Sequence, residues 1–232
     1  MYTLNVNNTG YLNTSDKAGV DIQWSSPIYT SSSSMSVDPI GVLKFTTSFL
    51  KILESEQGTI VNNSITSWRD IYFSKVLLKL KKGTDTGPGT TDYKIGVSTT
   101  ELTASNTSDG QALDTHNDVY TKTNLSCSVS GDIYTFDLTS FFNSFSSSTT
   151  INLEPSSSTW FLYLQRPSDS GTRYFSKKSD YTSTLSIEAM VSSGLSYYNE
   201  NSWIKCVPYY YDGTNWIRCQ ANYYRDGNWI KT

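Results

Sequence analysis

Residues 71–80 read IYFSKVLLKL and give the strongest strand signal in the chain. Apolar and polar side chains alternate here, and a period of two is typical of a half-buried β-strand. The alternation predicts two faces, one of Ser74, Val76, Leu78 and Leu80 and the other of Phe73, Lys75, Leu77 and Lys79. This stretch therefore favours a β domain.

Shorter stretches of strand-like sequence flank it on both sides. They cover residues 20–24, 93–97, 133–138, 160–164, 173–176 and 184–189, and the run GVLKFTTSFLKI at 41–52 is strongly apolar and β-branched. Several short strands at this spacing predict an antiparallel β-sandwich over residues 21–192. We expect residues 1–20 to form an N-terminal arm or edge strand, and residues 100–130 to form a long polar loop.

One short helix is expected within this domain, at residues 139–145, with Thr139 as its N-cap. Asp137, just before it, either binds a metal or fixes the turn into the helix, and we favour the turn.

Composition narrows the class of protein. Of the 232 residues, 17% are charged and 14% aromatic, and there are 17 tyrosines. This profile is typical of an all-β surface protein rather than a helical enzyme. The net charge of −3 gives no electrostatic footprint for nucleic acid. We find no apolar run of roughly 20 residues and no secretion signal, so we expect neither a membrane partner nor export.

The order of motifs resembles the DNRLRE family of jelly-roll domains, which are similar to carbohydrate-binding modules. The resemblance rests on Ser74 to Leu80, Tyr134 to Thr139, Phe175 to Asp180 and Leu185 to Ile187. It covers about residues 35–191 and implies a jelly-roll form of the sandwich.

The C-terminal residues contain an internal repeat. From Asn201 the chain reads NSWIKCVPYYYDG, TNWIRCQANYYRDG and NWIKT, with Trp203, Trp216 and Trp229 recurring every 13 residues. The Asp-Gly pairs are tight-turn signals, so we predict a small β-meander over residues 193–232. A tail this short cannot hold a core of its own and must pack on a neighbour, another copy of the chain or a ligand.

The tail resembles the ends of tail fibres and head appendages from tailed phages. The matching residues are Trp203, Lys205, Pro208, Tyr209, Tyr211, Gly213 and Trp216.

The tail also supplies the candidate contact residues, which are Trp203, Lys205, Tyr209, Tyr211, Trp216, Arg218, Tyr223 and Trp229. Three readings stay open: an apolar face of the meander, a subunit or virion contact, and a platform that stacks on sugars. A basic residue follows each Trp by two positions and therefore lies on the same face of the strand as that Trp; these residues are Lys205, Arg218 and Lys231.

Catalytic and metal-binding constellations are weak. The single histidine, His116, lies in LDTHND, where we expect a surface loop; Asp114 and Asp118 beside it more often belong to a solvated loop than to a cation site. The cysteines Cys206 and Cys219 should lie on alternate strands, too far apart to bridge, and we predict free thiols. With Cys127 the count is odd, which also argues against a disulfide scaffold.

Paired carboxylates are the remaining enzymatic idea. Glu54 with Glu56, or Asp169 with Asp180, would have to meet at the separation that glycoside cleavage requires, and nothing in the sequence sets either pair there. We expect no cofactor and no metal.

These observations favour a non-enzymatic phage virion protein, assembled in the host cytoplasm, with other virion proteins as partners and a homotrimer as its oligomeric state. The alternative is a carbohydrate-binding module for bacterial surface polysaccharide, and a glycan hydrolase is the third hypothesis.

Overall fold

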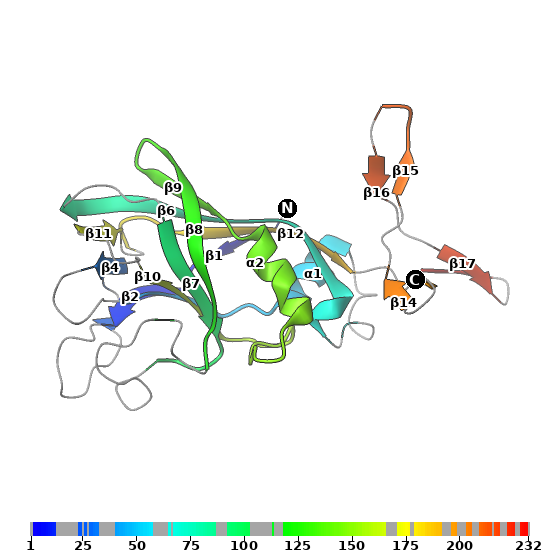
Figure 1. The fold of residues 1–232 in the computed structure, drawn as a ribbon, viewed down its shortest axis with the longest axis horizontal. Helices are drawn as coiled ribbons and strands as arrows, with labels where there is room; N and C mark the ends of the chain where they lie inside the picture. The colour runs from blue at the N-terminus through cyan, green and yellow to red at the C-terminus, as the bar shows by residue number, and fades with distance from the viewer. Residues whose placement is uncertain are drawn as a thin grey trace.

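A computed structural model describes residues 2–12, 23–24, 26, 28–32, 40–57, 65, 67–86, 92–102, 113, 118–165, 171–176, 179–191, 196–198, 203–205, 209–214, 216–218, 222–225 and 228–231. Twelve strands of this part of the chain form one antiparallel sheet (Figure 1). The strands are β1 (Tyr2–Asn5), β2 (Asn8–Leu12), β3 (Gln23–Trp24), β4 (Ile28–Ser32), β5 (Ile40–Phe45), β6 (Ile71–Thr86), β7 (Asp92–Ser98), β8 (Tyr120–Ser130), β9 (Ile133–Asp137), β10 (Trp160–Gln165), β11 (Gly171–Phe175) and β12 (Thr184–Val191).

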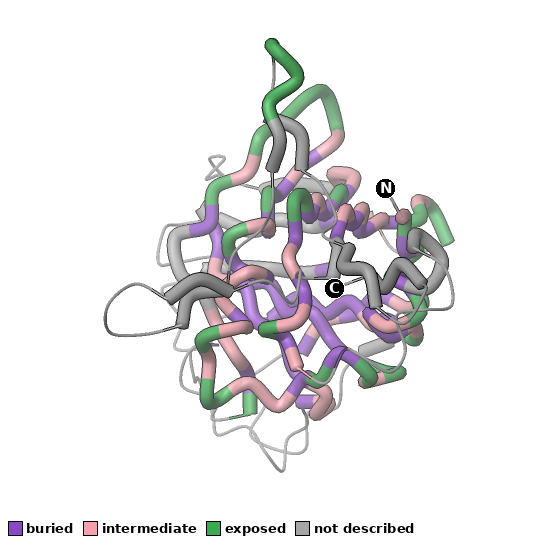
Figure 2. The backbone as a smooth tube through the Cα atoms, turned by 90° about the vertical axis from the view of Figure 1, so that its right-hand side faces the viewer, coloured by how far each residue is buried: buried purple, intermediate pink, exposed green. Residues whose placement is uncertain are grey.

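The sheet curls into a half-barrel around one core. Its strand order is β1-β12-β6-β9-β8-β7-β10-β5-β2-β3, and β11 joins β6 to β4. Strand β8 carries the curl, because residues 120–126 pair with β7 whereas residues 127–130 pair with β9. Buried residues run through the centre of the body (Figure 2). The predicted all-β, antiparallel class is confirmed.

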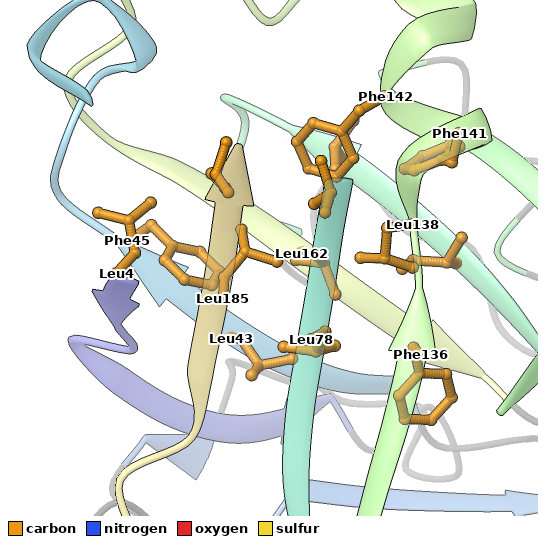
Figure 3. Packing of buried hydrophobic residues seen from close by; sticks show 14 of the residues in the cluster. Leu4, Leu43, Phe45, Leu78, Phe136, Leu138, Phe141, Phe142, Leu162 and Leu185 are labelled. Atoms are coloured by element: carbon orange, nitrogen blue, oxygen red, sulfur yellow. The ribbon is translucent and has the colours of Figure 1, made fainter. Parts of the chain in front are cut away.

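Both halves of the curled sheet contribute to this core. Leu43 of β5 and Leu162 of β10 come from one half, and Leu78 of β6, Phe136 of β9 and Leu185 of β12 come from the other (Figure 3). All five are fully buried.

Strand β6 is the stretch predicted at residues 71–80, but its two faces differ from the prediction. Phe73 is buried and Ser74 is exposed. Lys75 pairs with Glu188 and Phe73 with Ala189, so Ser74 is an extra residue in the ladder. Its hydroxyl donates to the Glu188 carbonyl at 3.1 Å. This β-bulge shifts the alternation by one residue, which a strict period of two does not anticipate.

The apolar run at residues 41–52 divides into a strand and a helix. Strand β5 ends at Phe45, and helix α1 covers Phe49–Gln57. Phe49, Ile52 and Leu53 are each 1% exposed, and their spacing is that of one helix face. Strand β5 is buried on both faces, whereas the buried residues after the polar Thr46-Thr47-Ser48 follow a helical spacing, so the purely strand-like reading was wrong.

Helix α2 (Thr139–Asn143) lies within the predicted short helix and continues as the 3₁₀ helix η4 (Ser144–Ser147). Asp137 accepts a hydrogen bond from the Thr139 amide at 2.9 Å, which confirms its predicted role in the turn. The N-cap is Leu138 rather than Thr139. The Thr139 hydroxyl instead accepts from the Val76 amide at 2.9 Å, so it ties the helix to β6.

Aromatic side chains close one end of the core. Trp160 stacks on Phe45 with ring centroids 4.2 Å apart, and its indole donates to the Thr47 carbonyl at 3.0 Å. Phe49 of α1 meets Trp160 at 5.1 Å and Trp68 at 4.9 Å. Trp68 lies in the 3₁₀ helix η2 (Trp68–Asp70) and donates to the Leu153 carbonyl. These tryptophans therefore have structural roles.

Asn143 attaches α2 to the bulged end of β6, and we expect its loss to destabilise the fold. Its side chain accepts from the Phe73 amide at 2.9 Å and donates to the Phe73 carbonyl at 2.8 Å, as a neighbouring strand would. Asn143→Leu leaves both backbone groups without this partner and should lower the free energy of unfolding by about 1–3 kcal/mol in urea titrations. Ser140→Leu, at an exposed position of the same helix, is the control and should change it by less than about 0.5 kcal/mol. Equal unfolding midpoints for the two variants would contradict this role.

A second apolar cluster covers the outer face of β5, β7 and β10. Leu102, Leu113 and Val119 pack there with Phe161 and Tyr163. The Tyr163 hydroxyl donates to the Thr100 carbonyl at 3.0 Å and accepts from the Leu102 amide at 3.1 Å. Burial raises the pKa of Tyr163 well above its ordinary value. The segment before β8 is thus anchored to the sheet.

The predicted polar loop at 100–130 is wrong in its second part. Residues 120–130 form β8. Ser126, Ser128 and Ser130 lie on one face of the strand and are exposed, and Val129 on the other face is 47% exposed. A strand that exposes both faces near a hairpin tip has no hydrophobic periodicity to detect.

The described N-terminal residues belong to the sheet rather than to a separate arm, and β1 is an edge strand, which was the second of the two expectations for residues 1–20. Strand β1 pairs with β12 at the edge, and β2 pairs with β5. Leu4, Val6 and Leu12 are buried in the two clusters. Residues 13–20 of the expected arm lie outside the described residues. Among the described residues, no helix combines the length and apolar character that crossing a membrane requires.

Candidate functional site

The C-terminal residues form three two-stranded ladders. They pair β13 (Ser196–Tyr198) with β14 (Trp203–Lys205), β15 (Tyr209–Tyr211) with β16 (Trp216–Arg218), and β17 (Asn222–Arg225) with β18 (Asn228–Lys231). Within the described part of the chain, no ladder joins one pair to the next or to the twelve-stranded sheet. In Figure 1 the β15–β16 hairpin projects beyond the body.

The small β-meander predicted over residues 193–232 is not confirmed, because the described residues of the tail form three separate hairpins. Among the tail residues that the structure describes, pairing occurs across the turns within each hairpin, and none is seen between hairpins. The chain between the hairpins carries no Asp-Gly signal, and Pro208 has no amide to donate to a ladder.

The three ladders share one register. Each pairs a Tyr with the Trp five positions later: Tyr198 with Trp203, Tyr211 with Trp216, and Tyr224 with Trp229. The separation between the paired Tyr and Trp is therefore constant, although the turn sequences differ.

The register sorts the predicted contact residues onto faces, because paired positions lie on the same face of an antiparallel ladder. Trp203 shares a face with Lys205. The middle ladder brings four of the candidates onto one face, namely Tyr209, Tyr211, Trp216 and Arg218.

In the third ladder the candidate Tyr223 lies on the opposite face from Trp229. It pairs with Ile230, and Tyr224 pairs with Trp229. Sequence reasoning thus missed Tyr224 and Tyr198 as members of the Trp face. The signal was present: the Tyr pairs at 197–198, 210–211 and 223–224 recur at the same interval of 13.

The tip of the middle hairpin is described in full and is exposed. Tyr211 is 54% exposed, and Asp212, Gly213 and Thr214 are exposed with it. The Asp212 carboxylate accepts from the Thr214 amide at 2.8 Å, and Gly213 has φ of +100°, which favours glycine. The Asp-Gly turn predicted here is confirmed. A tyrosine ring is therefore presented to solvent at the end of the Trp face.

The other candidate residues do not assemble into a described site. His116, Asp114, Asp169, Cys206 and Cys219 lie outside the described residues. Asp118 and Asp180 are exposed. Glu54 and Glu56 both fall in α1, where positions two apart do not face each other. Cys127 lies in β8 and is in no disulfide. The described residues contain no group of three or more metal-ligand candidates.

Comparison with known protein families and curated proteins gives no match. No protein-family model matches the chain, and no curated protein matches its sequence.

Proposed function

We propose that this chain is a non-enzymatic virion protein of a tailed phage, and that its C-terminal hairpins are the contact element through which it meets the host surface. The observation that carries the proposal is the shared register of the three ladders, each with a Tyr, a Trp and a basic residue on one face. The resemblance of the tail to phage fibre and appendage proteins supports the same assignment.

The body is, in this proposal, a jelly-roll sandwich of the DNRLRE-like kind that displays the tail. The larger of the two core clusters, to which both halves of the curled antiparallel sheet contribute, supports this view. The body would be held by other virion proteins of the capsid or tail, as a homotrimer.

The repetition of the hairpin explains how the tail would bind. Isolated two-stranded hairpins are marginally stable in water, so each hairpin needs to pack against a partner surface. Three hairpins per chain, multiplied over the copies on a particle, add weak contacts into strong attachment. No catalytic step is required.

Immunogold electron microscopy tests the assignment. An antibody raised against the purified protein should label intact particles released by the bacterium that encodes the chain, and mass spectrometry of purified particles should detect its peptides. Particles without label and without peptides would refute a virion role, whatever the protein binds.

The alternative function is a carbohydrate-binding module outside any particle. The exposed Tyr211, on the face of Trp216, favours sugar stacking. Binding of the pure chain to bacterial surface polysaccharide, together with particles that lack the protein, would favour this alternative.

A further inference from the structure

Each hairpin places a cation beside its tryptophan. Lys205, Arg218 and Lys231 follow Trp203, Trp216 and Trp229 by two positions within the strands β14, β16 and β18. Residues two apart in a strand lie on the same face. Every unit of the repeat therefore combines an aromatic ring and a positive charge at one register.

The ladders place no acid opposite these cations. The positions paired with Lys205, Arg218 and Lys231 are Ser196, Tyr209 and Asn222, none of which carries a carboxylate. The acidic residues of the tail are Glu200, Asp212 and Asp226, which lie in the connections between paired strands. The Trp faces thus carry positive charge at matching register positions, in a chain whose net charge is −3.

We propose that these three Trp faces are repeated subsites for an acidic polysaccharide. The aromatic rings stack on the flat faces of sugar rings, and the basic residue binds the acidic group of the same or the next sugar. A polymer fits better than a small anion, because three weak subsites in one chain gain affinity only when one ligand reaches more than one of them. The inference rests on the proposed contact role of the tail and specifies its ligand.

The third hairpin supplies a matched control. Arg225 pairs with Asn228, one position from the Tyr224–Trp229 pair, so it lies on the opposite face from Trp229. Arg218→Gln and Arg225→Gln remove the same charge from the same tail, but only the first removes it from a Trp face. Arg218→Lys keeps the charge and tests whether the charge is what matters.

Binding of the full-length chain to polygalacturonate, measured by biolayer interferometry at several salt concentrations, tests the proposal. Arg218→Gln should weaken binding about tenfold and lower its salt dependence, whereas Arg225→Gln should change it by less than about twofold. Arg218→Lys should retain most of the affinity, and Trp216→Ala should lose about as much as Arg218→Gln. Circular dichroism checks that each variant is folded.

Three results would overturn the proposal. The first is an equal loss in Arg225→Gln, which would indicate general charge attraction. The second is equal binding to neutral dextran, which would show that the negative charge of the ligand does not contribute to binding. The third is equal binding to polyglutamate, which would show that the sugar rings do not contribute. Because labelling of particles does not depend on any polysaccharide, failure here leaves the virion assignment to its own test.

Discussion

Replacing Trp160 with alanine should lower the free energy of unfolding by about 3–5 kcal/mol, the largest effect expected of a single substitution in this chain. Trp160 is completely buried, stacks on Phe45 and meets Phe49 of α1 and Phe142 of α2. The substitution leaves a cavity between strand and helices, and it removes the indole that donates to the Thr47 carbonyl. Urea unfolding followed by tryptophan fluorescence or circular dichroism measures the loss.

Trp216→Ala is the matched control for this prediction. It is the same substitution in a ladder that has no strand pairing with the sheet in the described part of the chain. We expect the body of this variant to unfold within about 0.5 kcal/mol of the natural chain. If Trp216→Ala cost as much as Trp160→Ala, the tail would be part of the body's core and its role as a contact element would be wrong.

Gly96→Ala should destabilise the body by about 1–3 kcal/mol through overpacking. A Cβ at this position of β7 would lie 2.5 Å from Cγ1 of Val119 and 3.3 Å from Cδ2 of Leu113. The segment that covers the outer face of the sheet approaches the backbone here more closely than any side chain at residue 96 permits. The expected result is a lower midpoint of urea unfolding.

A double-mutant cycle separates this steric cause from a general loss of β-propensity. Val119→Ala removes the Cγ1 atom that conflicts, so the double variant should be more stable than the sum of the single effects predicts, by at least about 0.5 kcal/mol. Strict additivity would show that the contact with Val119 is not the reason for glycine at this position.

The sequence predicted the strands of the body correctly where one hydrophobic periodicity continued along the whole element, and it failed where the periodicity was interrupted. The alternation in β6 identified a strand correctly but assigned Phe73 and Ser74 to the wrong faces, because the bulge opposite Glu188 and Ala189 adds one residue. A bulge depends on the partner strand, which local sequence does not contain. Helix α1 was missed because it follows the continuously apolar strand β5 after only the three residues Thr46-Thr47-Ser48, so the two elements resemble one apolar run.

For the tail, the sequence showed which residue types recur but not which of the tyrosines share a face with the Trp. The repeat of Trp and basic residues was visible, and the turn at Asp212-Gly213 followed from its chemistry. Starting the repeat at Trp203 rather than at Tyr198 split each hairpin between two units, so that Tyr198 and Tyr224 were not named as members of the Trp face. The recurrence of the Tyr pairs was visible in the sequence, but which Tyr of each pair lies opposite the Trp follows only from the strand register.

The central claim is that the Trp faces attach the particle to the host surface. The direct measurement compares natural particles with particles whose chain carries Trp203→Ala, Trp216→Ala and Trp229→Ala, by their adsorption to the bacteria that propagate them. Immunoblots first establish that the variant chain is retained on the particles. We predict that adsorption falls at least about tenfold, because all three subsites of every copy are lost together. Unchanged adsorption by particles that retain the variant chain would contradict the account.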